Sequence, residues 1–347
     1  MTPDGFALEW LAARLGAPAG TLRGMTSKRL GTGQMSDSFR LSLAWQGHDG
    51  PATIVAKCPS HDAQSRAIAV ALGSYAREVN WYSELAQRSA VARPHCYHAE
   101  IADDGLDFVL LLSDCAPAVQ ADQLAGAGEV QLRPAIAQLA ALHAPFWNVD
   151  MVAAYPWLGA SSRALIESAL PALAQGFAAR YAGRLAPETL ALAMDLTSNI
   201  GAYLDWPVSA TSVVHGDFRL DNLLFAPGGA MFVVDWQTVG VGCPYGDLAY
   251  LVGTSIANPV VRAGSEMGLF DDYVRAVEGF GVVIDRAAAS RDYRVHALSG
   301  VLMAIFASMN VERTERGDEM FAVMAERPAR QALELGSLGL ITGQVHD

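Results

Sequence analysis

The most informative segment of the chain is Val213-Val214-His215-Gly216-Asp217-Phe218-Arg219-Leu220-Asp221-Asn222-Leu223-Leu224-Phe225. An apolar strand leads into a His-Gly-Asp turn, and Asn222 follows Asp217 by five residues. A second apolar strand, over 231–234, leads directly into Asp235. Mg²⁺ prefers hard oxygen ligands and is usually held by one or two side chains together with phosphates. Two strand-end carboxylates with a carboxamide between them therefore suit a magnesium–nucleotide site. The remaining aspartate suits the deprotonation of a substrate hydroxyl.

Each of these motifs also has a purely structural interpretation. Asp-Asn pairs are frequent in turns because their side chains bond the local backbone, and Asp235 alone fits the cap of a following turn. The order and spacing of Asp217, Asn222 and Asp235 favour the catalytic interpretation over the structural one.

A lysine near the N-terminus completes this pattern. Ile54-Val55-Ala56-Lys57 is a short apolar strand that ends in a lysine. This lysine resembles the strand lysine that binds nucleotide phosphates in kinases. Glu78 lies on the next predicted helix, where it can pair with Lys57. The alternative is a solvated lysine and a glutamate on the helix surface.

A glycine-bearing loop precedes that strand. Residues 30–38 contain Gly31, Gly33 and Ser36, and they resemble a loop that covers nucleotide phosphates, with a serine in place of the third glycine. We expect backbone N–H groups and the Ser36 hydroxyl to hold phosphate oxygens, although many ordinary hairpins contain two glycines. The sequence has no Gly-x4-Gly-Lys-Ser/Thr element, which excludes the ordinary P-loop arrangement.

Composition excludes several classes of function. The 24 basic and 36 acidic residues give a formal net charge of −12, which argues against a nucleic-acid partner. No run of about eighteen apolar residues is present, so we expect no membrane span. The start of the chain lacks the pattern of a signal peptide, and the four cysteines are scattered as reduced thiols would be. We therefore predict a soluble cytoplasmic protein.

The periodicity of apolar residues predicts an α+β fold. Strands are expected within 30–45 (two, around the glycine turn) and over 53–57, 107–112, 212–214 and 231–234. Helices are expected over 1–15, 65–86, 130–143, 163–182, 187–204 and from 247 to the C-terminus, and 240–246 is expected to be a loop. This pattern indicates a small β-rich N-terminal lobe, residues 1–112, and a larger helical C-terminal lobe, residues 113–347.

Together these residues resemble the aminoglycoside phosphotransferase and choline-kinase-like superfamily, relatives of the protein kinases. The bacterial phosphotransferase and ecdysteroid-kinase-like branches are most similar. The motifs that carry the resemblance are His215-Gly216-Asp217 through Asn222, Asp235-Trp236-Gln237, Gly246-Asp247-Leu248-Ala249 and Leu142-His143-Ala144-Pro145-Phe146-Trp147. The resemblance implies a bilobal protein-kinase-like fold that binds ATP with its N-terminal lobe and carries catalysis and acceptor binding in its C-terminal lobe.

The resemblance also implies roles for single residues. Asp217 would be the catalytic aspartate, and Asn222 and Asp235 would hold Mg²⁺. Lys57 would contact the α- and β-phosphates and be positioned by Glu78. The backbone of the connector at Leu112 and Ser113 would contact adenine, and Asp247 would brace the catalytic loop. Arg219 would either neutralise charge on the transferred phosphoryl group or pair with a carboxylate.

The predicted function is a small-molecule kinase that uses ATP and Mg²⁺. Segments 155–205 and 262–345 are rich in Ala, Leu, Val and Met and show no prominent acidic cluster, which favours a partly apolar alcohol as acceptor. An aminoglycoside-type kinase, a hydroxyacyl-CoA kinase and a non-catalytic nucleotide-binding pseudokinase stay open as alternatives. The oligomeric state stays open as well.

Overall fold

The chain forms two compact units in a computed structural model that describes residues 2–31, 35–159, 163–311 and 313–344. The first unit comprises Met1–Arg88, Ala92–Val119 and Ala226–Thr238, and the second comprises Ser89–Val91, Gln120–Phe225 and Val239–Asp347. The first unit thus includes a late segment, Ala226–Thr238, that the sequence-based division assigned to the C-terminal lobe. The functional meaning of the two lobes stays a prediction.

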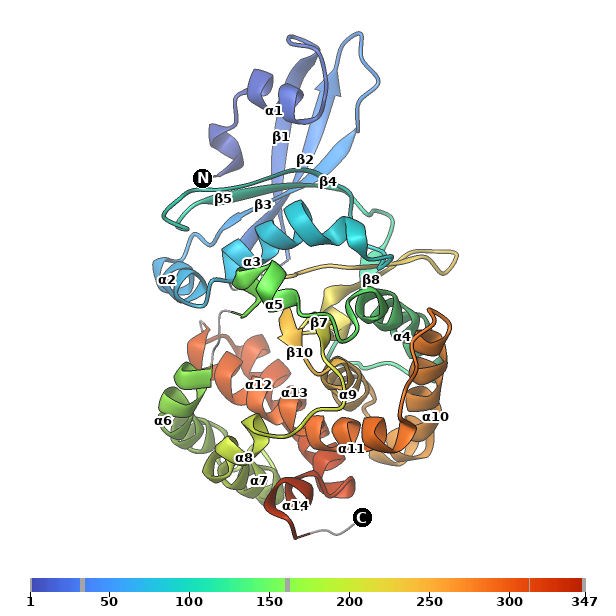
Figure 1. Cartoon of the computed structure of the whole chain (residues 1–347). Helices are drawn as coiled ribbons and strands as arrows, with labels where there is room; N and C mark the ends of the chain where they lie inside the picture. The colour runs from blue at the N-terminus through green and yellow to red at the C-terminus, as the bar shows by residue number, and fades with distance from the viewer. Residues whose placement is uncertain (1, 32–34, 160–162, 312, 345–347) are drawn as a thin grey trace. The chain divides into compact units, whose positions relative to one another are not determined.

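The first unit is built on a five-stranded antiparallel sheet in the order β1-β2-β3-β5-β4 (Figure 1). Its strands are β1 (Leu22–Leu30), β2 (Ser36–Trp45), β3 (Thr53–Pro59), β4 (Cys96–Ile101) and β5 (Phe108–Ser113). The sequence pattern missed β4 and most of β1. Both are edge strands of this sheet, and β1 carries mostly exposed residues, so neither shows the apolar run that marks a buried strand.

The two faces of the sheet bury different partners. Ile54, Ala56 and Cys58 of β3 face a core that also includes Leu11 of α1 (Leu8–Arg14). Because successive side chains of a strand alternate between faces, Lys57 points to the opposite side. Helix α3 (Ser74–Asn80) packs on β4 and β5 on that side. The period of the strand therefore directs Lys57 toward α3.

The single helix predicted over 65–86 is wrong. The chain forms α2 (Ala63–Ala71), then α3, and then a π-helical turn over Trp81–Leu85. Gly73 separates α2 from α3 with φ of 68°, a left-handed conformation that glycine adopts at little cost. The spacing of apolar residues continues across this bend, which is why periodicity alone did not reveal it.

The second unit consists mainly of helices (Figure 1). They are α4 (Glu129–His143), α5 (Met151–Ala154), α6 (Arg163–Tyr181), α7 (Pro187–Ser198), α8 (Ile200–Leu204), α9 (Pro244–Ser255), α10 (Pro259–Glu278), α11 (Arg286–His296), α12 (Leu298–Asn310), α13 (Glu315–Glu334) and α14 (Ser337–Thr342). A short ladder joins β7 (Ser212–Val214) to β10 (Gly240–Gly242) in antiparallel register. A further short strand of this unit is β8 (Leu223–Phe225), and β9 (Met231–Val233) belongs to the first unit. In β6 (Val119–Gln120), the first residue belongs to the first unit and the second residue to the second unit.

Three further predicted elements differ from the structure. The helix expected over 187–204 is interrupted at Asn199. The loop expected over 240–246 contains β10 and the start of α9, where Pro244 takes the first helical turn, a position that needs no backbone N–H. The N-terminal helix is shorter than 1–15, because a 3₁₀ turn at Pro3–Gly5 precedes α1.

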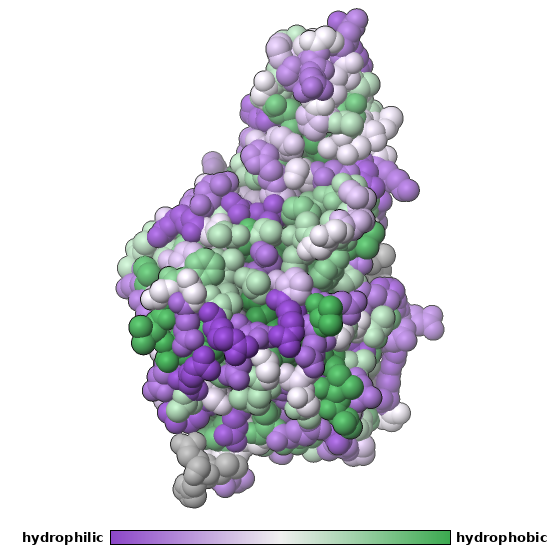
Figure 2. Space-filling model, turned by 90° about the vertical axis from the view of Figure 1, so that its right-hand side faces the viewer, coloured by the Kyte–Doolittle hydropathy of each residue, from purple (hydrophilic) through white to green (hydrophobic). Residues whose placement is uncertain are grey.

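Hydrophilic and hydrophobic residues are interspersed over the face of the molecule in Figure 2. Within the described ranges, we find no helix that is both long enough and apolar enough to cross a membrane.

Candidate active site

The first unit holds a buried cation between two carboxylates. The Lys57 Nζ lies 2.7 Å from Glu78 Oε2 and 2.8 Å from Asp235 Oδ1. Lys57 is 7% exposed and Glu78 is 1% exposed. The pairing of Lys57 with Glu78 that the sequence predicted is thus present, and Asp235 joins it.

The surrounding charges keep Lys57 protonated. Burial by itself lowers the pKa of Lys57, but the negative charges of Asp235 and Glu78 raise it, and the net pKa lies above the ordinary value. Burial raises the pKa of Glu78, and the Lys57 ammonium only partly offsets this. The arrangement therefore holds a charged ammonium group in a fixed position inside the first unit.

Asp235 sits in strained backbone that its neighbours hold in place. Its φ is 66°, a left-handed value that residues with a Cβ rarely adopt. The next residue, Trp236, donates its backbone N–H to Glu78 Oε1 at 3.2 Å, and its ring stacks on Trp81 with centroids 4.1 Å apart. The Asp235 side chain nevertheless remains 41% exposed, so its carboxylate is accessible to a ligand. Strain of this kind clusters at functional sites.

The glycine-bearing loop is anchored at its C-terminal end. Ser36 is buried, and its Oγ accepts a hydrogen bond from Gln237 Nε2 at 2.8 Å. Gly31 lies in an exposed turn with φ of 61°. Gly33 lies outside the described residues. The phosphate-binding role of the loop stays a prediction.

At the end of β5, where the connector begins, one backbone N–H group is already hydrogen-bonded within the protein. The Ser113 N–H donates to the His95 carbonyl oxygen at 2.8 Å, and Ser113 Oγ accepts from the His95 N–H at 2.9 Å. Leu112 lies in β5, which pairs with β3 on one side and β4 on the other. The Ser113 N–H is thus already engaged, and adenine contacts from Leu112 and Ser113 stay a prediction.

In the second unit, a buried carboxylate holds the backbone of the predicted catalytic loop. Asp247, on the first turn of α9, accepts the N–H groups of His215 at 2.7 Å and Gly216 at 2.9 Å. Its Oδ2 also lies 3.2 Å from His143 Nε2. Burial raises the pKa of Asp247, but the hydrogen bond and positive character of His143, together with His215, bring it below the ordinary value. The carboxylate is therefore ionised and braces the loop as predicted.

Several donors surround the carboxylate of Asp217. Tyr250 donates its hydroxyl to Oδ1 at 2.9 Å, and Asn222 donates Nδ2 to Oδ2 at 2.9 Å and to the Asp217 carbonyl oxygen at 2.8 Å. Arg219 Nε lies 3.1 Å from Oδ1 and 3.3 Å from Oδ2. The side chain of Asp217 is 20% exposed. Because the amide nitrogen of Asn222 is used here, its amide oxygen is the atom suited to a metal ion.

Arg219 is paired with carboxylates. Besides Asp217, it contacts Asp221 through Nη1, which lies 2.6 Å from Oδ2. Burial by itself lowers the pKa of Arg219, but the negative charges of Asp217 and its neighbours outweigh burial. The net pKa lies above the ordinary value, so the guanidinium stays charged. Of the two roles expected for Arg219, pairing is observed, and an action on the phosphoryl group stays a prediction.

Two residues of this region escaped the sequence interpretation. Tyr250 lies outside the recognised motif, although it follows Asp247 by one helical turn. Gln123 is buried and binds the loop from a distant part of the sequence. Its Oε1 accepts the Leu220 N–H at 3.0 Å, and its Nε2 donates to the Thr254 carbonyl oxygen at 2.8 Å. A contact between residues 97 positions apart leaves no local signal.

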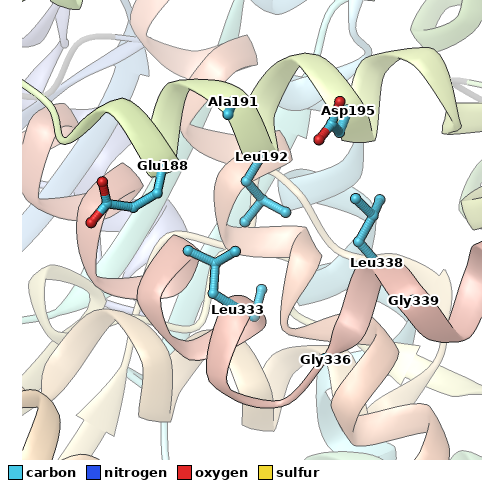
Figure 3. A pocket seen from close by; sticks show the side chains of 9 residues that line it. Glu188, Ala191, Leu192, Asp195, Leu333, Gly336, Leu338 and Gly339 are labelled. Carbon is cyan, nitrogen blue, oxygen red and sulfur yellow. The ribbon is translucent and has the colours of Figure 1, made fainter. Parts of the chain in front are cut away.

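A cavity of about 290 Å³ lies elsewhere in the second unit (Figure 3). Leu192 of α7 and Leu333 and Leu338 of α13 and α14 line it, and the carboxylates of Glu188 and Asp195 lie at its edge. Its lining includes none of the predicted site residues.

Within the ranges that the structure describes, no group of three or more His, Cys, Asp or Glu side chains is arranged to hold a metal ion. The magnesium ligands Asn222 and Asp235 stay a prediction.

Comparison with known proteins identifies the family. The model of the phosphotransferase enzyme family matches residues 47–287, a range that contains Lys57, Asp217 and Asp235. The chain belongs to the phosphotransferase enzyme family. The superfamily that the motifs predicted is thereby confirmed, although the glycine-bearing loop precedes the matched residues of this phosphotransferase.

Solved structures confirm the predicted protein-kinase-like fold class of the phosphotransferase. A microcompartment-associated aminopropanol kinase is 15% identical, with 91% of this chain and 95% of that chain covered and a TM-score of 0.55. The ethanolamine kinase Pv091845 of Plasmodium vivax is 8% identical, with 92% and 83% covered and a TM-score of 0.51. The GDP complex of aminoglycoside 2′-phosphotransferase-IIIa is 14% identical, with 89% and 94% covered and a TM-score of 0.51.

One curated protein matches a short segment of the phosphotransferase. Acyl-CoA dehydrogenase family member 10 of Mus musculus is 52% identical over 42 residues, which are 12% of this chain and 4% of the mouse protein. The matched segment is thus a small part of both proteins.

Proposed function

We propose that this phosphotransferase is a kinase that transfers the γ-phosphoryl group of ATP, with Mg²⁺, to a hydroxyl group of a small-molecule alcohol. The observation that carries the proposal is the buried Lys57, whose Nζ lies within 2.8 Å of both Glu78 and Asp235. A buried cation with fixed partners is suited to binding a polyanionic nucleotide. Membership of the phosphotransferase enzyme family supports the same conclusion.

The nucleotide contacts are assigned to the first unit. Lys57 would bind the α- and β-phosphates, and Glu78 would keep its ammonium group in place. Gly31, Gly33 and Ser36 would contribute from the glycine-bearing loop, and the connector backbone near Leu112 and Ser113 would contact adenine.

The available oxygen atoms fit Mg²⁺. Asp235 has a partly exposed carboxylate, and the amide oxygen of Asn222 is left when its nitrogen binds Asp217. Both are hard oxygen donors, and Mg²⁺ commonly takes one or two protein ligands together with phosphates and water. When bound, the ion would neutralise negative charge on the phosphates. Under this proposal Asp235 and Asn222 are its protein ligands.

Asp217 orients the acceptor hydroxyl and receives its proton. The hydroxyl oxygen forms a bond to the γ-phosphorus while the bond from that phosphorus to the bridging oxygen breaks. The bridging oxygen keeps the electron pair and leaves with ADP, and the proton moves to the Asp217 carboxylate. Positioning and electrostatics supply most of the acceleration in such reactions. Arg219, held beside Asp217, supplies positive charge near the reacting groups.

The acceptor class rests on composition. The helices at 163–181 and 298–310 are rich in apolar residues, which favours a partly apolar alcohol over a polycationic antibiotic. Aminoglycosides and hydroxyacyl-CoA thioesters stay as alternative acceptors. A pseudokinase that binds nucleotide without turnover is the alternative outside enzymes, although a binding protein has no need of a base such as Asp217.

The test uses the purified full chain with ATP or GTP, Mg²⁺ and a panel of amino alcohols, terpenoid alcohols, aminoglycosides and hydroxyacyl-CoA esters. ADP or GDP formation and the mass of the phosphorylated product are measured. We expect slow background hydrolysis of ATP and faster turnover with a suitable acceptor, and both should stop when Mg²⁺ is chelated. Nucleotide binding without turnover across the whole panel would favour the pseudokinase instead.

A further inference from the structure

Tyr250 is placed to act on Asp217. It lies on α9 three residues after Asp247, so the two side chains project from the same face of the helix. Asp247 binds the backbone N–H groups of His215 and Gly216, and Tyr250 binds the Asp217 carboxylate at 2.9 Å. One turn of α9 thus holds the loop at two points, the backbone through one residue and the reactive side chain through the other.

The position of the Tyr250 ring is fixed by close packing. Tyr250 is 4% exposed. A Cβ added at Gly300 of α12 would lie 2.5 Å from Pro328 of α13 and 3.5 Å from the Tyr250 ring, so these helices approach each other closely at the ring. Burial, followed by the charge of Asp217, raises the pKa of Tyr250 well above the ordinary value. The hydroxyl therefore remains a donor.

The other donors do not set the rotation of the Asp217 carboxylate by themselves. Arg219 Nε is almost equidistant from the two oxygens, at 3.1 and 3.3 Å, so it attracts the group without distinguishing one oxygen from the other. Asn222 binds Oδ2, and Tyr250 binds Oδ1. With a donor on each oxygen, the plane of the carboxylate is defined.

We propose that Tyr250 is a positioning residue that fixes the orientation of the Asp217 carboxylate toward the acceptor hydroxyl. This inference rests on the proposed kinase function and extends it to a residue outside the recognised motifs. Tyr250 itself touches neither ATP nor the acceptor; it acts through Asp217.

The test compares the variant Tyr250→Phe with the unaltered chain. The probe is ATP with Mg²⁺, and ADP formation is followed with water as the acceptor. We expect kcat to fall about tenfold because a small misplacement of a catalytic group is costly, while KM for ATP stays unchanged. Melting temperatures verify that each variant is folded.

Tyr293→Phe is the matched control. Tyr293 is also buried, and its hydroxyl also donates to a carboxylate, Glu266 Oε1 at 2.8 Å, away from the catalytic loop. We expect kcat of this variant to equal that of the unaltered chain. An equal fall of kcat in both variants would overturn the proposal, because general loosening of the helices would then explain the effect.

A double-mutant cycle separates this inference from the function on which it rests. If Tyr250 acts through Asp217, Tyr250→Phe causes no further loss in an Asp217→Asn background. A further loss of about tenfold there, or an unchanged kcat for Tyr250→Phe alone, refutes the positioning role while leaving the kinase intact. Full activity of Asp217→Asn refutes the role of Asp217 and the inference with it.

Discussion

The two units hold charge in opposite ways. In the first, the ammonium of Lys57 lies between the carboxylates of Glu78 and Asp235. In the second, the carboxylate of Asp217 lies among the donors of Tyr250, Arg219 and Asn222. Each unit thus fixes one charge by surrounding it with groups of opposite polarity. Under the proposed function, the fixed cation binds phosphates and the fixed anion orients a hydroxyl.

The supporting elements differ as well. Lys57 lies within a sheet strand whose alternation sets its direction, so local sequence determines where it points. Asp217 lies in a loop whose backbone is held by Asp247 of α9. The direction of Lys57 thus depends on secondary structure, although its partner Asp235 lies 178 positions away, whereas the backbone of the Asp217 loop is held by a tertiary contact. Substitutions should therefore separate binding defects in the first unit from chemical defects in the second.

The largest expected effect comes from Asp217→Asn. The variant keeps the shape of the side chain but removes the proton acceptor, so we expect the rate of phosphoryl transfer to fall by about 10²–10⁴-fold. Affinity for ATP and Mg²⁺, measured by calorimetry, should stay the same. Asp195→Asn, which changes an exposed aspartate of α7, serves as the control with full activity. Comparable rates for the two variants would remove Asp217 from the chemistry.

Asp235→Ala should impair the proposed magnesium binding of the first unit. We expect a loss of activity of at least about 10²-fold, because metal ions supply several kcal/mol of charge stabilisation in such reactions. ATP affinity should also lose its dependence on Mg²⁺ while the melting temperature still shows a folded chain. Unchanged magnesium dependence in the variant would show that Asp235 is no magnesium ligand.

Lys57→Met tests the buried ion pair through stability. The substitution leaves Glu78 buried beside Asp235 without its cation, and removing one partner of a buried pair typically costs about 3–5 kcal/mol of unfolding free energy. The double variant Lys57→Met/Glu78→Met should recover most of this loss. Urea denaturation measures both. Equal stabilities of the single and double variants would indicate that the pair is solvated.

Local sequence was sufficient for part of this picture. The fold class, the ion pair of Lys57 with Glu78 and the spacing of Asp217 and Asn222 all follow from motifs and short-range periodicity. Helix periodicity did not reveal the bend at Gly73, because the apolar spacing continues through it. Edge strand β1 carries polar residues and gave little signal.

The remaining contacts of the site depend on residues far apart in sequence. Gln123 reaches Leu220, and Tyr250 reaches Asp217 across 33 positions. No pattern within either segment marks these partners, because tertiary packing alone brings them together.

Asp247→Asn should change the acid stability of the second unit. The folded pKa of Asp247 is lowered from 3.8, so its contribution to stability is present above pH 3.8 and is lost as pH falls through the lower folded value. The variant should be less stable than the unaltered chain at neutral pH, and the difference should shrink in acid. Urea denaturation at neutral pH and in acid measures it. A difference independent of pH would contradict an ionised Asp247.

The smallest expected effects come from two glycines with opposite backbone conformations. Gly73→Ala in the first unit places a Cβ on a left-handed residue, which costs about 1 kcal/mol. Gly264→Ala lies inside α10 of the second unit, where the new Cβ meets open space, and should stabilise by up to about 1 kcal/mol. Thermal denaturation measures both shifts. Shifts of the same sign would contradict the left-handed bend between α2 and α3.

The most direct test of the central claim follows ATP that is radiolabelled in its γ-phosphate. The label is traced in the presence of the alcohol panel for the unaltered chain and for Asp217→Asn, each with Mg²⁺ and with a chelator. We predict labelled alcohol only from the unaltered chain with Mg²⁺. Labelled alcohol from Asp217→Asn at the same rate, or none from the unaltered chain although ATP binds, would contradict the proposed phosphoryl transfer.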